Sequence, residues 1–355
     1  MALGQIILLD NVNAYHSLFS RIPRCRQDIY FTAEYYLIHQ NMGGGKATCF
    51  VFEDGEDLVL YPFLMNPISP LGYDLPYECY DIQGAYGYNG ILTSSDDPAF
   101  ITAFHEAFDA FCLDRRIVAE FTRFHPVLNN QLLASPKMRM YFSRNTVKLD
   151  LSQTLEDIWQ HSFSPKNRNV IKKAEKEGVT IVESDDYREF SRLYDRTMQD
   201  VGAEDFYFFP PAYYSDFQEM LKKNLTLCFA MYQDTPIAGS MFMFFGDYAH
   251  YHLSGRDRNY HKLAANNAVL WYAIKKAKEM GCKWFHFGGG TTGEPSDPLL
   301  HFKRNFSKES GEFWYGKRVH DPVVYDRIVD QWKACYPESY QKNCVKLLGY
   351  REINH

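Results

Sequence analysis

The sequence predicts an α/β protein that contains the same supersecondary unit twice. The order hairpin, helix, strand occurs between residues 47 and 124, and it returns between residues 225 and 287. The chain has 355 residues, which is too long for one ordinary core and suits two domains. With 46% hydrophobic and 16% aromatic residues, both domains should be well packed. We expect domains at residues 1–148 and 149–330, followed by a C-terminal helical tail at residues 331–355.

The first half of the chain contains a hairpin, a helix and a strand. Two β-type runs, Ala47–Glu53 and Leu58–Asn66, flank the turn Asp54–Asp57, and this arrangement predicts a hairpin. A helix is expected at Pro98–Leu113 and a strand at Ile117–Phe124. These elements define the unit whose order is repeated in the second half.

The second half shows clearer boundaries. Ser164-Pro165 is a cap followed by proline at the first helical position, and Gly178 is a typical stop, so a helix is expected between them. The other expected elements are the strand 179–182, the helices 187–200 and 211–224, the strands 225–232, 237–245 and 248–253, the helix 265–280 and the strand 284–287.

The segment 247–306 has the features of an anion site. A strand that leads into a helix facing an open cleft presents free backbone N–H groups and the positive end of the helix dipole. Gly288–Gly290 follow the strand 284–287 and let a ligand approach the backbone closely. Phe302 and Phe306 should anchor the next segment, so that the Lys303 ammonium points into the cleft. A lysine that extends along an apolar edge into water is the alternative interpretation.

A second basic cluster lies on the helix that begins at Pro165. Arg168, Lys172 and Lys176 are spaced i, i+4, i+8 and share one face. A solvated helix surface explains such a cluster equally well. Arg168, however, lies in the first turns, where a cation opposes the helix dipole, and this placement favours ligand binding.

Composition excludes several classes of protein. A formal net charge of -6 argues against a general DNA-binding protein. The eight cysteines form no CxxC pair, which indicates reduced thiols and a cytoplasmic protein. Neither a signal peptide nor an apolar run of about 18 residues is apparent, so we expect no integral membrane contact.

The titratable side chains suggest no metal site and no covalent nucleophile. His250, His252 and His286 have no carboxylate or cysteine at ligand spacing, so no metal is expected. Because no covalent nucleophile is suggested either, the mechanism that remains is direct transfer of a group between two bound substrates. Oxyanion donors are expected among the backbone N–H groups near Gly288–Gly290 and tyrosines such as Tyr86 and Tyr251, and no general base is assigned because Glu120 and His252 are each better explained as structural.

Several segments together resemble one protein family. They are Arg168–Gly178, Asn266-Asn267 with Trp271, Phe285–Gly289, Phe302-Lys303, Tyr86–Gly90 and Glu120–Pro126. In this order they resemble the FemAB-like branch of the GNAT superfamily, from about Ile29 to Lys317. The resemblance implies two tandem GNAT-like domains with mixed, mostly antiparallel sheets and a substrate groove between them.

The resemblance also implies an activity. The best-known members add amino acids from aminoacyl-tRNA to the peptide stem of a peptidoglycan precursor, and others transfer acyl groups from a coenzyme A thioester. We therefore expect an acyltransferase that acts on an amine of a polar acceptor, with a cell-wall precursor peptide as one candidate. The donor would be aminoacyl-tRNA or acyl-coenzyme A, and no cofactor would be bound permanently. A coenzyme A dependent N-acyltransferase acting on a small amine or an amino sugar is the first alternative, and a non-catalytic module for an anionic ligand is the second.

The expected substrate-binding residues are Tyr86, Arg123, Arg168, Lys172, Tyr251, Asn266, Asn267, Gly288, Gly289, Phe302 and Lys303. Two features depart from the family pattern. The stretch Arg258–Ala264 contains no glycine where GNAT proteins have a pyrophosphate loop, so weak binding of acetyl-coenzyme A is expected. Residues 187–224 are too few for the long helical hairpin that bridge-forming members insert there.

Overall fold

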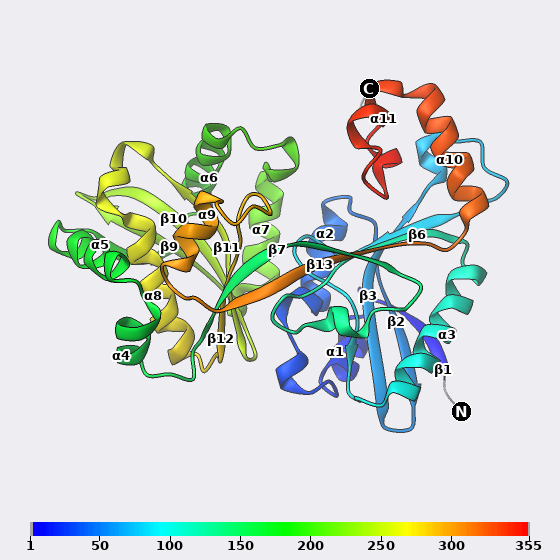
Figure 1. Ribbon diagram of the computed structural model, residues 1–355, viewed down its shortest axis with the longest axis horizontal. Coiled ribbons are helices and arrows are strands. Elements are labelled where there is room, and N and C mark those ends of the chain that lie inside the picture. Colours follow the sequence, from blue (N-terminus) through cyan, green and yellow to red (C-terminus); the bar gives the residue numbers. More distant parts are fainter. Residues whose placement is uncertain (1–2, 354–355) are drawn as a thin grey trace. The chain divides into compact units, whose positions relative to one another are not determined.

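The computed structural model describes residues 3–353, which form two compact units. The first unit consists of residues 3–26, 30–143 and 313–353, and the second consists of residues 27–29 and 144–312. Each unit is a mixed β-sheet with helices packed against it (Figure 1). Within residues 3–353, no helix has both the length and the apolar character that a bilayer span requires.

The first unit is built on the strands β1 (Leu3–Leu8), β2 (Lys46–Asp54), β3 (Asp57–Pro67), β4 (Tyr80–Gln83), β5 (Leu92–Thr93), β6 (Ile117–Arg123) and β13 (Ser310–Val319). Its helices are α1 (Val12–Phe19), α2 (Ala33–Asn41), α3 (Pro98–Asp114), α10 (Pro322–Cys335) and α11 (Pro337–Asn343). The strand order is β1-β2-β3-β4-β6-β13, with β5 paired to β3.

The second unit is built on the strands β7 (Arg139–Asp150), β8 (Thr180–Ser184), β9 (Leu225–Tyr232), β10 (Thr235–Phe245), β11 (Tyr248–Arg256) and β12 (Trp284–Gly289). Its helices are α4 (Leu155–Asp157), α5 (Pro165–Lys176), α6 (Tyr187–Val201), α7 (Pro211–Met220), α8 (Ala265–Glu279) and α9 (Pro298–Arg304). The strand order is β7-β12-β11-β10-β9-β8.

The two units share one topology. In each, four strands pair antiparallel in chain order, β1 to β4 in the first unit and β8 to β11 in the second. The last of these then pairs with a parallel strand, β4 with β6 and β11 with β12, and a helix (α3 or α8) connects the two. An antiparallel strand, β13 or β7, completes each sheet. This repeated order confirms the duplicated, mostly antiparallel α/β fold that the sequence predicted.

The completing strands come from unexpected parts of the chain. β13 pairs with β6, with Tyr315 opposite Arg123, so residues 313–353 belong to the first unit. The sequence predicted a second domain at residues 149–330 and a separate tail at residues 331–355. The compact units divide the chain differently. The alternation of side chains along a strand indicates which face is buried, but it does not indicate the partner strand.

Aromatic side chains at helical spacing form the core of the first unit. Phe100, Phe104 and Phe108 on α3 lie at i, i+4, i+8 and are nearly completely buried. Phe104 lies near Phe50 and Phe52 of β2, with ring centroids 6.0 and 6.1 Å away. The helix thus covers one face of its sheet through a continuous aromatic stripe.

The last turn of the chain is fixed in the first unit by a buried ion pair. Arg351 Nε donates to the Asp81 carboxylate at 2.7 Å, and Arg351 Nη2 donates to the carbonyl oxygens of Asn66 and Pro67 at 3.1 and 3.0 Å. Asp81 is 0% exposed, and Tyr350 also donates to it at 2.7 Å. Burial raises the pKa of Asp81, while Arg351 and Tyr350 oppose this rise. Tyr350 and Arg351 are therefore anchored in the first unit.

We expect Arg351→Met to lower the free energy of unfolding by about 3–5 kcal/mol, because it leaves a buried carboxylate without its counter-charge. Urea denaturation measures this effect. Lys346→Ala is the control, since the side chain of Lys346 is 49% exposed and lies 3.9 Å from Glu352. A change of less than about 1 kcal/mol in the Arg351 variant would show that the ion pair does not hold the C-terminus.

Candidate functional site

The parallel strands β11 and β12 separate soon after they begin to pair. Tyr248, Ala249 and His250 pair with Trp284, Phe285 and His286. Beyond this point β11 continues to Arg256 along β10, and β12 continues to Gly289 along β7. In the described residues, the register between the two strands ends at His250, and we call the unpaired region between their facing edges beyond this point the opening.

Lys303 reaches this opening from α9. Its Nζ donates to the carbonyl oxygen of Gly289 on β12 at 2.7 Å and lies 5.9 Å from the ring centroid of Tyr251 on β11. The lysine is only 7% exposed. Its ammonium group therefore lies between the two diverging strands, and a role for it in a substrate cleft stays a prediction.

The environment of Lys303 disfavours its charge. Burial lowers the pKa of Lys303 to about 7, with a further lowering from nearby Arg144 and an opposing contribution from Asp297. Near neutral pH the side chain is then present in both protonation states. A group whose charge can change at this pH is suited to a role in catalysis.

The glycines after β12 make room for side chains of the protein itself. Gly288 has φ +78°, and a Cβ placed there would lie 3.2 Å from Lys303 Nζ. A Cβ at Gly290 would lie 2.5 Å from Asp297 Oδ1. Arg144 Nη1 donates to the carbonyl oxygens of Gly290 and Thr291 at 2.8 and 2.7 Å. The three glycines thus let Lys303, Asp297 and Arg144 approach the backbone closely. The sequence predicted that a ligand would make this close approach.

The helix α8 begins without a side-chain cap. The residue at its N-cap, Ala264, has φ 50° and ψ 37°, and no side chain accepts from the first turn. The first N–H groups of a helix have no partner within the helix and carry its positive dipole end. Ala264 takes the left-handed conformation that glycine favours, so the connection makes a tight turn although it contains no glycine.

A cavity of about 430 Å³ lies at this helix start. Lys166, Arg256, His261 and His301 supply basic groups at its wall, and Asp257 supplies a carboxylate. The remaining lining residues are Asn167, Val170, Ile237, Tyr260, Ala264, Ala265, Asn266, Asn267, Pro298, Phe302 and Asn305. The balance of charge and the uncapped helix favour an anionic ligand.

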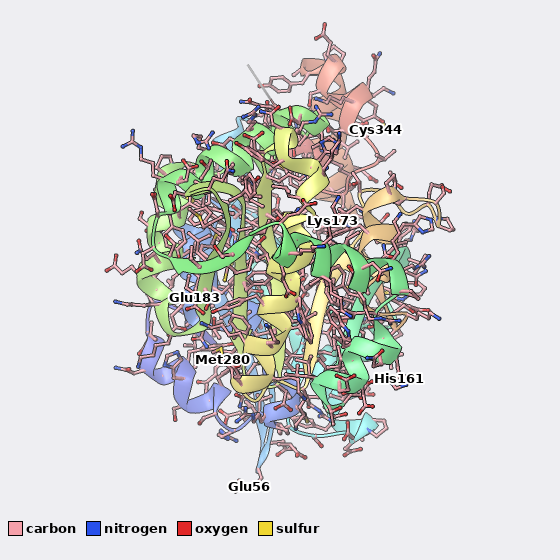
Figure 2. The ribbon with its side chains drawn as sticks, turned by 90° about the vertical axis from the view of Figure 1, so that its left-hand side faces the viewer. Glu56, His161, Lys173, Glu183, Met280 and Cys344 are labelled. Carbon is pink, nitrogen blue, oxygen red and sulfur yellow. The ribbon has the colours of Figure 1, made fainter. Side chains whose placement is uncertain are left out.

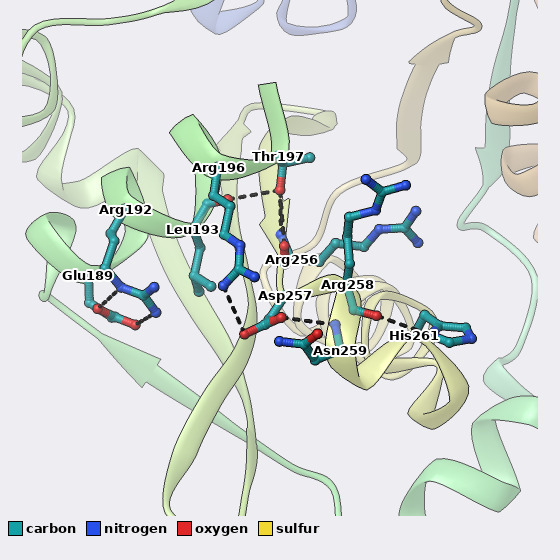
Figure 3. A network of polar contacts seen from close by, with 10 residues as sticks. All are labelled: Glu189, Arg192, Leu193, Arg196, Thr197, Arg256, Asp257, Arg258, Asn259 and His261. Carbon is teal, nitrogen blue, oxygen red and sulfur yellow. Dashed lines mark hydrogen bonds and ion pairs between the residues drawn. The ribbon is translucent and has the colours of Figure 1, made fainter. Parts of the chain in front are cut away.

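The connection from β11 to α8 is held by α6 (Figure 3). Thr197 Oγ1 accepts from the Arg256 N–H at 2.8 Å, and Arg196 Nη1 lies 3.3 Å from Asp257 Oδ2. Asp257 Oδ1 in turn accepts from the Asn259 N–H at 2.9 Å. These contacts with α6 and within the connection therefore hold the rim of the cavity in place without a ligand.

The corresponding opening in the first unit is filled by the chain. After β4 and β6 part, Asn89 bridges to Phe124, and its N–H donates to the Arg123 carbonyl oxygen at 2.6 Å. The Arg123 N–H donates back to Asn89 Oδ1 at 2.7 Å. The helix after this loop, α3, is capped by Asp97 and has proline at its first position. Of the two units, the second is thus the one with an open edge and an uncapped helix.

The structure places nine of the eleven predicted site residues in three groups. Tyr251, Gly288, Gly289 and Lys303 meet at the opening between β11 and β12. Asn266, Asn267 and Phe302 line the cavity at α8. Tyr86 and Arg123 belong to the first unit, where Tyr35 donates to the Tyr86 carbonyl oxygen at 2.7 Å and the Arg123 guanidinium lies 5.5 Å from the Phe121 ring centroid.

Arg168 and Lys172 make contacts outside the cavity. Arg168 Nη1 donates to the carbonyl oxygens of Trp159, Gln160 and Phe163 at 3.2, 2.9 and 2.7 Å. It thereby satisfies carbonyl oxygens of the π-helical turn Ile158–Ser162 and of the residue after it, and such a turn has no clear sequence signal. Lys172 Nζ lies 5.8 Å from the Trp159 ring centroid, and Lys173 lies on the same exposed helix surface (Figure 2). These contacts favour a structural role for Arg168, and ligand binding by either residue stays a prediction.

Two histidines of β11, and the two candidate bases Glu120 and His252, are engaged in contacts with other side chains. His250 Nε2 lies 2.7 Å from Asp28 Oδ2, and His252 Nε2 lies 2.9 Å from the Tyr213 hydroxyl. Glu120 accepts from Tyr61 at 2.6 Å and lies 2.9 Å from His320 Nε2. Burial raises the pKa of Glu120, but the contacts with His320 and Tyr61 lower it further than burial raises it. Glu120 is therefore held as a charged, buried structural group.

Comparisons with known proteins agree with this geometry. A family model described as an acetyltransferase (GNAT) domain matches residues 162–304, which include the opening and the cavity. This part of the chain is therefore similar to a GNAT acetyltransferase domain. A search of the curated proteins gave no match.

Solved structures extend the likeness to the whole fold. FemX has a TM-score of 0.65 at 13% identity, covering 91% of this chain and 99% of that chain. A conserved protein of unknown function from Bacteroides thetaiotaomicron has a TM-score of 0.54 at 10% identity, covering 90% and 100%. A tandem GNAT protein from the clavulanic acid biosynthesis pathway has a TM-score of 0.52 at 10% identity, covering 91% and 99%. The fold is therefore a tandem GNAT-like fold similar to that of FemX, as the sequence resemblance implied.

For Arg168→Ala we expect the free energy of unfolding to fall by about 1–3 kcal/mol, because three carbonyl oxygens lose a charged donor. Chemical denaturation and a thermal scan measure this loss. Lys172→Ala, one turn away on the exposed surface, should stay within about 0.5 kcal/mol of wild type. If the Arg168 variant is as stable as wild type but binds the donor less tightly, the guanidinium belongs to the ligand site.

Proposed function

We propose that the second unit transfers an acyl or aminoacyl group from an activated, anionic donor to an amine of a polar acceptor. The observation that carries this proposal is the position of Lys303, a buried amine with a pKa of about 7, between the diverging strands β11 and β12. α9 contributes to both parts of the site, because Phe302 lines the cavity at α8 while Lys303 lies at the opening.

In this proposal the donor lies along the open edge of β11. An extended ligand can pair with such an edge in the manner of an added strand. Its phosphate would accept from the first N–H groups of α8 and lie near Lys166 and Arg256 at the cavity wall. The activated carbonyl would then lie beside Lys303.

The reaction follows from this placement. The unprotonated acceptor amine attacks the donor carbonyl carbon, and the carbonyl oxygen becomes an oxyanion. The Lys303 ammonium stabilises that oxyanion from a buried position where water screens it little. The intermediate then expels the thiolate or the ribose oxygen of the donor, and the proton released by the amine passes to that leaving group through solvent.

The donor is acyl-coenzyme A or aminoacyl-tRNA in this proposal, and neither is held as a permanent cofactor. Weak binding of acetyl-coenzyme A was predicted because Arg258–Ala264 contains no glycine. The left-handed conformation of Ala264 supports coenzyme A as a candidate, because it supplies the turn that glycine supplies elsewhere. Calorimetry with coenzyme A and with a tRNA pool separates the two donors.

The acceptor in this proposal is a small amine, an amino sugar or a cell-wall precursor peptide. The resemblance to the FemAB-like branch supports the precursor peptide, and Tyr86 and Arg123 of the first unit stay predicted substrate-binding residues. A turnover assay that offers each acceptor class with the identified donor tests this assignment.

Lys303→Ala should lower turnover by at least about tenfold, equivalent to about 1.4 kcal/mol of lost transition-state stabilisation. Lys303→Arg should restore only part of the activity, because the planar guanidinium does not occupy the place of a compact ammonium. Activity is measured with the donor that calorimetry identifies, together with the melting temperature.

Lys275→Ala is the matched control for this experiment. Lys275 lies on α8 with its Nζ 5.5 Å from the Trp271 ring centroid, outside the residues that line the cavity. Unchanged turnover in Lys303→Ala would remove Lys303 from the mechanism. Parallel losses of melting temperature and turnover would make it a structural residue.

Donor affinity should fall as the pH rises through about 7, because an anionic donor binds better to the protonated form of Lys303. Donor binding should therefore take up a proton just above this pH. Calorimetry in buffers of different ionisation enthalpy measures the uptake. In Lys303→Met the uptake should vanish, and an unchanged pH dependence in that variant would assign the titration to another group.

A further inference from the structure

The loop that follows β12 begins with three glycines and needs support from other side chains. Gly288, Gly289 and Gly290 leave room for close neighbours, and Gly288 has φ +78°. Glycine restricts the backbone less than any other residue, so three in succession do not fix a loop by themselves. The Gly289 carbonyl oxygen is nevertheless the acceptor for Lys303 Nζ, at 2.7 Å. The position of this amine therefore depends on the groups that hold the loop.

Arg144 on β7 holds the loop through its backbone. Its Nη1 donates to the carbonyl oxygens of Gly290 and Thr291 at 2.8 and 2.7 Å. The stem of Arg144 passes close to Gly289, where a Cβ would lie 2.9 Å from Arg144 Cδ. Hydrogen bonds from a charged donor are roughly twice as strong as those between neutral groups, and a guanidinium presents its N–H groups in a rigid plane. Arg144 thus fixes the two residues that come directly after Gly289.

Asp297 ties the same loop to α9 and acts on Lys303 only at a distance. Its carboxylate accepts from the Thr292 N–H and hydroxyl at 2.8 and 3.1 Å and from the Leu300 N–H at 2.9 Å. Because both oxygens are used, Asp297 opposes only part of the lowering of the Lys303 pKa by burial and by Arg144. Tyr251 on β11 also faces the amine, and burial raises the pKa of Tyr251, so its hydroxyl is neutral at neutral pH.

We propose that Arg144 is a positioning residue for Lys303, which holds the loop after β12 so that the lysine amine stays on the Gly289 carbonyl oxygen. The inference rests on the proposed function, because it concerns the same lysine, but its test requires neither donor nor acceptor. Without Arg144 the loop would relax and the amine would gain water, which favours its protonated form. Loss of the neighbouring cation favours protonation as well. Both effects raise the pKa of Lys303, so Arg144 keeps this lysine able to change charge near neutral pH.

NMR titration of the full chain with isotope-labelled lysine measures the pH midpoint of the Lys303 amine directly. The Lys303 signal is the one that is missing from Lys303→Arg. In Arg144→Met we expect the midpoint to rise from about 7 by about one pH unit. Arg144→Lys keeps the cation but lacks the planar guanidinium that reaches two carbonyl oxygens, so its midpoint should rise too. Arg188→Met removes the same charge from an exposed position on α6 and is the matched control, with an unchanged midpoint.

Raised midpoints in both Arg144 variants support the proposal. An unchanged or lowered midpoint in Arg144→Met overturns it, as does a wild-type midpoint already near the ordinary value for lysine. A wild-type midpoint in Arg144→Lys also overturns it, because the cation would then act through its charge alone. A purely structural role would lower the melting temperature without moving the midpoint. Melting temperatures show whether Arg144→Met is folded, and Arg144→Lys decides the result if it is not.

Turnover is measured separately, so that this proposal and the proposed function can fail independently. Raised midpoints with unchanged turnover would leave the positioning role of Arg144 in place and count against Lys303 in the reaction. Unchanged midpoints in the Arg144 variants, together with lost turnover in Lys303→Ala, would refute the positioning role while the proposed function stands.

Discussion

The early separation of β11 from β12 is the constraint on which the site depends. Parallel strands that stay paired leave no backbone group for a ligand, because each N–H and C=O is already satisfied. Here the register ends at His250, while β10 and β7 continue to hold the outer edges of the two strands. The sheet therefore stays intact on both sides of the opening. A rigid opening in a packed sheet can position a substrate without any rearrangement of the core.

The placement of Lys303 carries a cost in stability. A buried ammonium group loses most of its hydration, and this loss lowers its pKa to about 7. Burial against the Gly289 carbonyl oxygen compensates only in part, and the glycine at 288 is needed for the approach. A residue kept in such an environment is better explained by chemistry than by packing, because an apolar side chain would fill the same space at lower cost.

Local helices could be predicted from the sequence, but the pairing of distant strands could not. Periodicity and caps predicted α3, α5, α6 and α8 within a few residues. The partner of β13 could not be predicted, because alternation along a strand is the same whichever strand lies beside it. Arg168 was placed near a ligand because its cation opposes the dipole of α5. Arg168 instead donates to carbonyl oxygens at the π-helical turn Ile158–Ser162. This contact could not be predicted, because such a turn has no clear sequence signal.

The two units show how one topology can be closed or open at the same position. In the first unit, Asn89 continues the parallel pairing and Asp97 supplies a carboxylate to the start of α3. A helix that begins with its own carboxylate already has its positive end neutralised and offers little to an anion. In the second unit, Ala264 supplies no side-chain acceptor, and the helix start faces a basic cavity. Differences at a single loop and a single cap thus close this position in one copy and leave the other with an unpaired strand edge and an uncapped helix start.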